Sequence, residues 1–304
     1  MKKKMILITS LILLSVCAAL IILAVFLKKN AFDPTAEEIT VDLDGVDSPV
    51  KILWISDLHI AVKSKNSMGK YSDDLLARVK WTQNSAGKWK NNWPDLINNS
   101  GADLVVFGGD MLDFGSLNNA SVFRDGLNKL KIPYIYLRCD HDVMPTYISQ
   151  LEADEAAKIR DGLCDNSDII TYEFEDFTVA GWNNSSFNIT DDGLKKMQDI
   201  CSNGKPVLLM THVPLEPKQD TSLSEASRDI FQGRSLLWGY NDQYYWPEYN
   251  TRQFLDIIYA DDSPVKEVFC GHLHFSWDGY LTDSVKQHVF AAAFEENYGI
   301  ITVK

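Results

Sequence analysis

The sequence predicts an α/β fold in which two stacked mixed β-sheets are flanked by helices, preceded by one N-terminal transmembrane helix. An uncharged apolar run near the amino terminus supports the transmembrane helix. Apolar runs rich in β-branched and aromatic residues then alternate with helix-like segments, as in sheets covered on both faces. Near the carboxyl end such runs follow one another closely, which favours hairpins and two sheets over a single doubly wound sheet.

The amino-terminal residues predict a signal anchor. Residues 5–27 carry no charged side chain, and a helix needs about 20 apolar residues to cross a hydrocarbon core. A cleaved signal peptide would have a shorter apolar run, and lipidation at Cys17 is disfavoured because the bulky Val16 precedes it. The lysines before the span favour a cytoplasmic amino terminus at residues 1–4. We therefore expect a single-pass membrane protein whose folded body is extracytoplasmic.

The rest of the chain is expected to form a linker and one large domain. Residues 28–48 are predicted to contain a polar linker and a short strand, and residues 49–304 the domain. Strands are predicted over residues 50–56, 102–109, 132–138, 168–174, 177–182, 206–211, 266–271, 287–293 and 298–303. Helices are predicted near residues 72–93, 117–129, 145–162, 190–203 and 250–260.

Charge and cysteine spacing exclude some classes of function. After residue 30 the chain holds 24 basic and 42 acidic side chains, a formal net charge of −18. Such a surface repels polyanions, which argues against a nucleic-acid scaffold. The four cysteines of the body are too widely spaced for a CxxC zinc pattern.

Histidines and aspartates gather where the predicted strands end. These residues are Asp57, His59, Asp110, Asp113, Asp140, His141, Asp142, His212, His272 and His274. Any one of them alone would be read as a cap or a surface residue. Five of the six histidines share this position, however, and separate structural explanations for all of them would be a coincidence. Imidazole and carboxylate suit divalent cations, and seven or eight ligands are too many for one ion, so the pattern predicts two metals.

These residues occur in five ordered blocks, DLH (57–59), GDMLD (109–113), CDHD (139–142), TH (211–212) and GHLH (271–274). In this order the chain resembles the calcineurin-like metallophosphoesterases over residues 50–303. Five ordered blocks are specific where one D-x-H would be weak. The resemblance implies the metallophosphoesterase type of the predicted fold, with layers in the order α-β-β-α.

The resemblance also implies a role for each residue. Asp57, His59 and His274 would hold one divalent metal, and Asp140, His212 and His272 the other, with Asp110 as the bridge. Asp113 and Asp142 would orient ligands and His141. The two ions, manganese, iron, zinc or similar, would activate a bridging hydroxide that attacks the phosphate ester. His141 would contact the phosphate and assist the leaving oxygen as the catalytic histidine.

Two positions depart from the family pattern. Cys139 stands where glycine is usual, and Asp140 stands where asparagine is the usual ligand. Asp140 adds a negative charge, so we expect tighter cation binding and a less acidic bridging water. If Asp140 instead distorts the second site, the protein would be a weak enzyme or only a binding protein.

An aromatic segment at residues 231–254 has two interpretations. Its rings favour a loop held to the domain by buried side chains. The alternative is a substrate lip over the metals that stacks a sugar or base and holds an anionic group. The candidate lip residues are Trp238, Tyr240, Tyr244, Tyr245, Trp246, Arg228 and Arg234. Trp81, Trp89 and Trp93, at near-helical spacing, are expected to form a packed helix face.

The function predicted from these features is that of a membrane-anchored dimetal phosphoesterase, a metal-dependent hydrolase of phosphate mono- or diesters or pyrophosphate bonds. Its partners would be a phosphate-ester substrate and the membrane. The competing interpretation is a catalytically weak or inactive binding or assembly protein of the same fold at the membrane surface. A mononuclear hydrolase is a third, which applies if Asp140 does not hold the second ion.

Overall fold

The computed structural model describes residues 15–20, 22–23, 32–62, 72–144, 149–164, 167–184, 188–239 and 245–304. Residues Pro34–Lys304 form one compact unit. In the described part of the chain, no helix has both the length and the apolar character that a membrane span requires. Most of the anchor predicted at residues 5–27 lies outside the described residues, although residues 15–20 and 22–23 are helical.

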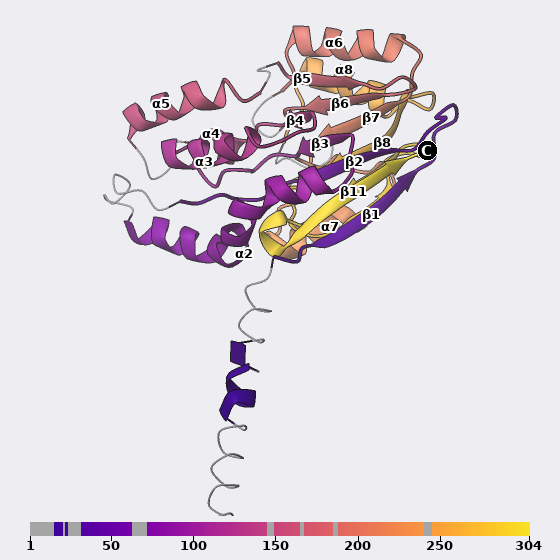
Figure 1. The fold of residues 1–304 in the computed structure, drawn as a ribbon. Coiled ribbons are helices and arrows are strands. Elements are labelled where there is room, and N and C mark those ends of the chain that lie inside the picture. Colours follow the sequence, from indigo (N-terminus) through magenta and orange to yellow (C-terminus); the bar gives the residue numbers. More distant parts are fainter. Residues whose placement is uncertain are drawn as a thin grey trace, which may run out of the picture. The chain divides into compact units, whose positions relative to one another are not determined.

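Two mixed sheets form the centre of the unit (Figure 1). The first contains, in spatial order, β1 (Thr35–Val41), β11 (Asn297–Val303), β2 (Val50–Ile55), β3 (Leu104–Phe107) and β4 (Tyr134–Tyr136). The second contains β5 (Ile169–Glu173), β6 (Thr178–Trp182), β7 (Val207–Thr211), β8 (Val265–Cys270), β10 (Lys286–Val289) and β9 (Trp277–Tyr280). Strands β2, β3 and β4 are parallel to one another, and so are β6, β7, β8 and β10.

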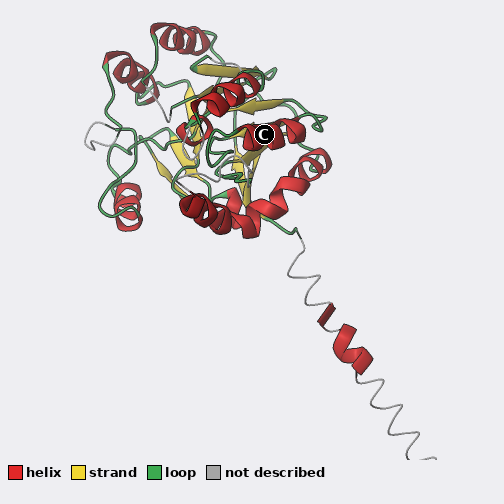
Figure 2. Cartoon of the chain, turned by 90° about the vertical axis from the view of Figure 1, so that its left-hand side faces the viewer, coloured by secondary structure: helices red, strands yellow, loops and turns green. Residues whose placement is uncertain are grey.

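Helices cover the outer faces of both sheets (Figure 2). The helices are α2 (Ser72–Asn99), α3 (Leu117–Leu127), α4 (Asp140–Val143), α5 (Gln150–Arg160), α6 (Asp191–Ser202), α7 (Ser222–Ile230), α8 (Tyr249–Ile258) and the 3₁₀ turn η1 (Ala293–Glu295). The predicted α/β class with two mixed, helix-flanked sheets is therefore confirmed.

Two buried hydrophobic clusters lie on opposite faces of the second sheet, because side chains alternate along its strands. Successive residues of a strand point to opposite faces. Ile52, Trp54 and Val106 of the first sheet share one buried cluster with Met210 and Phe269 of the second, between the sheets. On the other face of the second sheet, a larger cluster joins its strands to α6, α7 and α8. Because both faces are covered, these strands are nearly all apolar, as the sequence shows.

Several elements differ from the prediction. The short strand predicted within residues 28–48 is present as β1, but the sequence did not predict its partner: its seven residues pair in parallel with β11. The helix predicted over residues 145–162 corresponds to α5, and residues 145–148 lie outside the described part. The short helix α4 lies before that range and was not predicted. Helix α7 and strand β9 were not predicted. Helix α7 buries Leu223 in the cluster on the second sheet, and β9 pairs with β10 at the edge of that sheet.

Candidate metal centre

The loops at the carboxyl ends of β2, β3 and β8 have an unusual backbone. Asp57, His59, Asp110, His272 and His274 have φ values of 54°, 47°, 51°, 71° and 58°. Residues other than glycine rarely adopt this left-handed conformation, which costs about 1–3 kcal/mol each and occurs mainly at functional sites. Backbone hydrogen bonds hold two of them, because the N–H groups of Asp57 and His59 donate to the carbonyls of Gly109 and Asp110, both at 2.9 Å.

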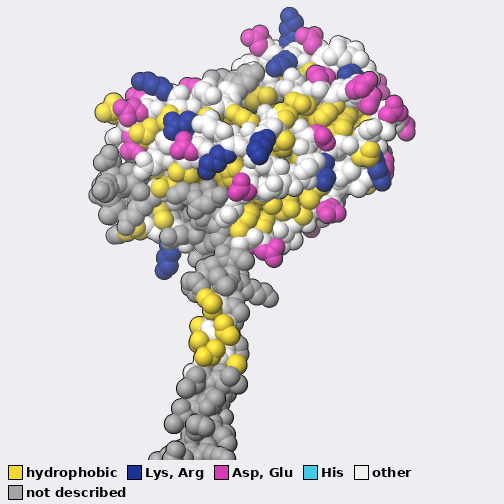
Figure 3. Space-filling model, in the orientation of Figure 1, with side chains coloured by type: hydrophobic (Ala, Val, Ile, Leu, Met, Phe, Trp, Pro, Cys, Tyr) yellow, Lys and Arg dark blue, Asp and Glu magenta, His cyan; other side chains and the backbone are white. Residues whose placement is uncertain are grey.

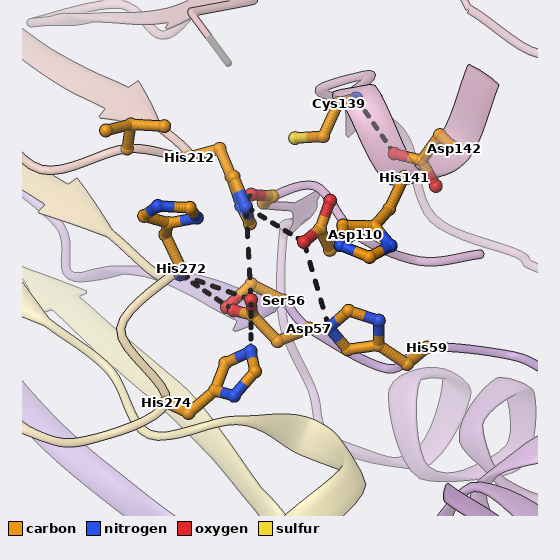
Figure 4. Close-up of polar contacts among 12 residues, drawn as sticks. Ser56, Asp57, His59, Asp110, Cys139, His141, Asp142, His212, His272 and His274 are labelled. Carbon is orange, nitrogen blue, oxygen red and sulfur yellow. Dashed lines mark hydrogen bonds and ion pairs between the residues drawn. The ribbon is translucent and has the colours of Figure 1, made fainter. Parts of the chain in front are cut away.

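Asp57, His59 and His274 come together at one end of the sheets. One oxygen or nitrogen of each lies within 4.8 Å of those of the other two. The distance from His274 Nε2 to Asp57 Oδ1 is 3.4 Å. Asp57 and His59 are fully buried, whereas His274 is partly exposed. This is the set that the family resemblance assigns to one metal (Figure 4).

Asp110 lies between this group and His212 (Figure 4). Asp110 Oδ2 is 3.7 Å from His59 Nε2 and 3.3 Å from His212 Nε2. The ring of His272 lies 5.0 Å from the ring of His212, and its backbone N–H faces the Asp57 carboxylate at 3.1 Å. Asp110 thus lies between His59 and His212, which the resemblance assigns to different metals.

The ring orientation of three histidines follows from their hydrogen bonds. His212 Nδ1 is 2.8 Å from the carbonyl of Gly108, and His141 Nδ1 is 3.0 Å from the carbonyl of Asp113. A carbonyl only accepts, so in both rings Nδ1 carries the proton and donates it. His59 Nδ1 likewise donates to Asp113 Oδ1 at 2.9 Å. When each ring is neutral, its Nε2 keeps a lone pair, as metal ligation by His59 and His212 requires.

The buried donor atoms fit a metal. In the part of the chain that the structure describes, His59 Nε2, His212 Nε2, His272 Nε2 and Asp110 Oδ1 are buried and have no hydrogen-bond partner. Leaving a buried polar atom without a partner costs about 1–3 kcal/mol. Four such atoms in one place, all imidazole nitrogen or carboxylate oxygen, match the donor set of zinc, iron or manganese.

Electrostatics at the site also favour cations. Burial raises the pKa of Asp57 and Asp110, but the charges and hydrogen bonds of the surrounding histidines, His212 first among them, together outweigh burial and hold both pKa values below their ordinary range. Burial, reinforced by the charge of His212, lowers the pKa of His272 to about 3. Ionised carboxylates beside a neutral imidazole are the protonation states that bind a metal.

Asp113 and Asp142 hold the loops together. Asp142 accepts hydrogen bonds from the backbone N–H of Leu112 at 2.8 Å and of Cys139 at 2.9 Å, and thereby joins the loop after β3 to α4. Burial and the charge of Asp110 raise the pKa of Asp142 to about 7. Asp113 binds His59 and also Arg78 of α2. Asp113 thus contacts a predicted ligand directly, whereas the Asp142 carboxylate holds the backbone of the adjoining loops.

Two positioning residues were missed by sequence reasoning. Asn184 Oδ1 accepts from the backbone N–H of His212 at 3.1 Å and of Val213 at 2.9 Å, so it fixes the loop after β7. Arg78 Nε donates to Asp113 Oδ2 at 2.8 Å. Neither residue lies in a motif block, and the tertiary contacts alone reveal Asn184. A basic residue one helical turn before Trp81 was the available signal for Arg78.

The two departures from the family pattern lie at the start of α4. Cys139 is buried, and its Sγ groups with Asp110 and His212 within 4.8 Å. Burial raises the pKa of its thiol to about 12. Asp140 is partly exposed, and its charge contributes to raising the pKa of His141 against the opposing effect of burial. Its role as a ligand stays a prediction.

Two glycines are required by close approach. A Cβ on Gly109, whose φ is +96°, would lie 2.0 Å from Cys139 Sγ. A Cβ on Gly271 would lie 2.4 Å from Asp57 Oδ2 and from Ser56 Oγ. The glycines of GDMLD and GHLH therefore let the thiol and the carboxylate enter the site.

Only some of the candidate lip residues lie near the metal ligands. Trp238 is buried, its ring centroid lies 5.5 Å from that of Trp182 in a tilted contact, and its Nε1–H donates to the carbonyl of Asn184 at 2.6 Å, so it belongs to the core. The Tyr245 ring lies 5.3 Å from Trp238 and 6.1 Å from His272, and thus approaches the metal ligands.

The remaining lip candidates are less closely tied to the metal ligands. Trp246 is 51% exposed and lies under Arg252. Arg228 contacts Ser224, and Arg234 contacts Phe231. Tyr240 and Tyr244 lie outside the described residues.

The family model of the calcineurin-like phosphoesterases matches residues 50–276. A comparison with curated proteins finds no match.

Similar solved structures include a dimetal phosphatase from Danio rerio, with 12% identity, a TM-score of 0.43, and coverage of 81% of this chain and 88% of that one. A purple acid phosphatase from yellow lupin has 10% identity, a TM-score of 0.46, and coverage of 80% and 44%. The family match covers most of the chain and contains every residue placed above at the metal centre. The chain belongs to the calcineurin-like phosphoesterase family.

Proposed function

We propose that the chain hydrolyses phosphate monoesters, phosphodiesters or pyrophosphate bonds with the help of two divalent metal ions. The observation that carries the proposal is the arrangement of His59 and His212. Each has its Nδ1 tied to an oxygen acceptor and its Nε2 directed at Asp110. A protein that kept this fold only for its surface would have no need of such donors.

Asp57, His59 and His274 would hold one metal, and Asp140, His212 and His272 the other, with Asp110 between them. Bound there, the metals supply polarisation of the phosphoryl oxygens and a water of lowered pKa. The chain itself fixes the ligand geometry, because the loops are closed by backbone hydrogen bonds and by the Asp142 carboxylate. Such preorganisation reduces the cost of ordering the site during the reaction.

His141 is the residue best placed to act as a general acid. Its ring lies 5.0 Å from that of His59, and its Nδ1–H is held by the Asp113 carbonyl. The free atom is Nε2, which can hydrogen-bond a phosphate oxygen or protonate the leaving oxygen. The charge of Asp110 raises the pKa of His141 although burial lowers it, and this favours the protonated ring.

We also propose that residues 5–27 anchor the protein in a membrane, with the hydrolase domain on the extracytoplasmic side. The uncharged run and the lysines before it support this proposal.

Hydrolysis assays on the full chain, kept in a mild detergent and supplied with manganese, test the proposed activity. An aryl phosphodiester and an aryl phosphomonoester are compared, and the ratio of their rates begins to define the substrate class. Asp110→Asn is expected to lower kcat/KM by about a hundredfold or more, because a shared metal ligand is removed. The matched control is Asp125→Asn, since the Asp125 side chain is 62% exposed on α3.

Loss of activity in Asp110→Asn alone would support the hydrolase. A folded wild-type chain that binds two metals but turns over neither ester would instead favour the binding protein, in which the change from asparagine to Asp140 has abolished catalysis.

A further inference from the structure

The tryptophans of helix α2 differ in exposure along the helix. Toward its carboxyl end, Trp89 and Trp93 are completely buried, and Trp93 packs 5.3 Å from Phe107 of β3. These two rings form the packed helix face that the sequence predicts. Earlier in the helix, Trp81 is 46% exposed, so it does not share their role.

The exposed Trp81 lies beside the metal ligands. Its ring centroid is 5.8 Å from that of His59 and 6.3 Å from that of His274. Both histidines belong to the group with Asp57. The centroid of Phe294, in η1, is 4.6 Å away and supports the indole from the side of the domain. Trp81 therefore borders the place where a phosphate ester would meet the first metal.

Arg78 fixes this ring. Its guanidinium carbon lies 4.6 Å from the centroid of the Trp81 ring, in a cation–π contact. The same guanidinium binds the carboxylate of Asp113, which in turn holds His59. Because Arg78 and Trp81 are one turn apart on α2, one element sets both the ligand orientation and the position of the indole.

A purely structural role does not explain the exposure. A tryptophan that only attached α2 to η1 would be expected to be covered, as Trp89 and Trp93 are on the same helix. An indole that is held in place and yet open offers a rigid flat surface at low entropic cost. Flat organic groups stack on such surfaces irrespective of their hydrogen-bonding pattern.

We propose that Trp81 determines specificity by stacking on a flat organic ring attached to the bound phosphate. The preferred substrates are phosphate esters of aryl or nucleoside groups, rather than of alkyl groups. This assignment rests on the proposed hydrolase function, because it requires a phosphate at the metal centre.

The proposal is tested by measuring the affinity of two phosphonates by isothermal titration calorimetry, which does not depend on catalytic turnover. Phenylphosphonate and cyclohexylphosphonate carry the same anionic group and rings of similar size, but only phenyl is flat. Each is titrated into the manganese-loaded full chain and into Trp81→Ala, Trp81→Phe and Tyr280→Ala. Tyr280 is the control because it is an aromatic residue, 53% exposed, on β9.

The wild type is expected to bind phenylphosphonate about tenfold more tightly than cyclohexylphosphonate. Trp81→Ala should abolish this preference, Trp81→Phe should retain part of it, and Tyr280→Ala should leave it unchanged. Bound manganese is counted in every variant, so a change of the metal site is recognised separately from a loss of stacking.

Equal affinity of the wild type for both phosphonates would overturn the assignment of Trp81 and leave the hydrolase intact. The same holds if Trp81→Ala, carrying its full complement of metal, kept the preference for phenyl. A wild-type chain that bound two manganese ions but neither phosphonate would overturn the hydrolase and the stacking site together.

Discussion

At the scale of single residues, the metal centre concentrates conformations that are unfavourable elsewhere. Among the described residues, the left-handed backbone at Asp57, His59, Asp110, His272 and His274 places five predicted ligands in one strained set. Buried donor atoms without partners add to that cost. Neither feature stabilises the fold, and both are explained if the loops are built for a ligand.

His288, the histidine outside the motif blocks, has a different role. Its Nδ1 lies 2.5 Å from Asp278 Oδ1, and its Nε2 lies 2.9 Å from Glu267 Oε2. Burial lowers its pKa, but the hydrogen bonds to the two carboxylates outweigh burial, and the net pKa is raised. The ring therefore joins β10 to β8 and β9 as a buried imidazolium between two acids.

This raised pKa predicts a pH-dependent contribution to stability. The contribution is fully present below the unfolded pKa of about 6.5 and is lost as the pH rises through the higher folded pKa. His288→Gln should therefore lower the free energy of unfolding by about 2 kcal/mol at pH 6 and by less at pH 9. Denaturant unfolding at both pH values measures the difference. A penalty that is equal at the two pH values would contradict the imidazolium.

At the scale of secondary-structure elements, α2 and α3 are held together by one close contact. Gly126 of α3 faces Trp93 of α2, and a Cβ at this position would lie 2.0 Å from Trp93 Cζ2. The buried Trp93 in turn lies against Phe107 and Phe123. This packing determines where α2 runs, and therefore where Arg78 and Trp81 meet the site.

Gly126→Ala should reduce the free energy of unfolding by about 2 kcal/mol, because overpacking costs more than the gain in helix propensity. Gly162→Ala is the matched control, since its Cβ would meet Ile159 O at an ordinary 3.4 Å. The control should change stability by less than about 1 kcal/mol. Urea denaturation of both variants tests this contact. Equal effects at the two positions would show that Trp93 moves aside freely.

At the scale of the whole molecule, charge and hydrophobicity are divided along the chain. The first thirty residues contain no acidic side chain, whereas the remainder carries a net charge of −18. On the face shown in Figure 3, basic and acidic side chains are interspersed rather than collected into one patch. Such a surface suits a water-exposed domain, and the apolar amino-terminal run suits attachment to a bilayer.

The proposed anchor makes a further prediction. After expression in a bacterial host, the full chain should remain in the membrane pellet through an alkaline carbonate wash, because a spanning helix is not removed by loss of electrostatic contacts. A chain that begins at residue 32 is the control and should appear in the soluble fraction. Extraction of the full chain by carbonate would exclude a spanning anchor.

The sequence by itself determined the fold class and the metal-centre candidates, for a physical reason. Strands buried on both faces must be nearly all apolar, so polar residues at their ends stand out, as Asp57 and His59 do after β2. Their order along the chain then matched one family.

Other features were decided only by the tertiary structure. Strand β1 is a strand because it pairs with β11, more than 250 residues away in sequence. Asn184 reaches the backbone of His212, and Arg78 reaches Asp113 across the domain. In the sequence, Trp81, Trp89 and Trp93 follow one near-helical spacing and cannot be told apart. Only the packing of α2 shows that the Trp81 indole stays exposed beside His59. The periodicity of a segment predicts which residues share one face of a helix or strand. It does not predict which distant segment packs against that face, because such contacts depend on the folding of the whole chain.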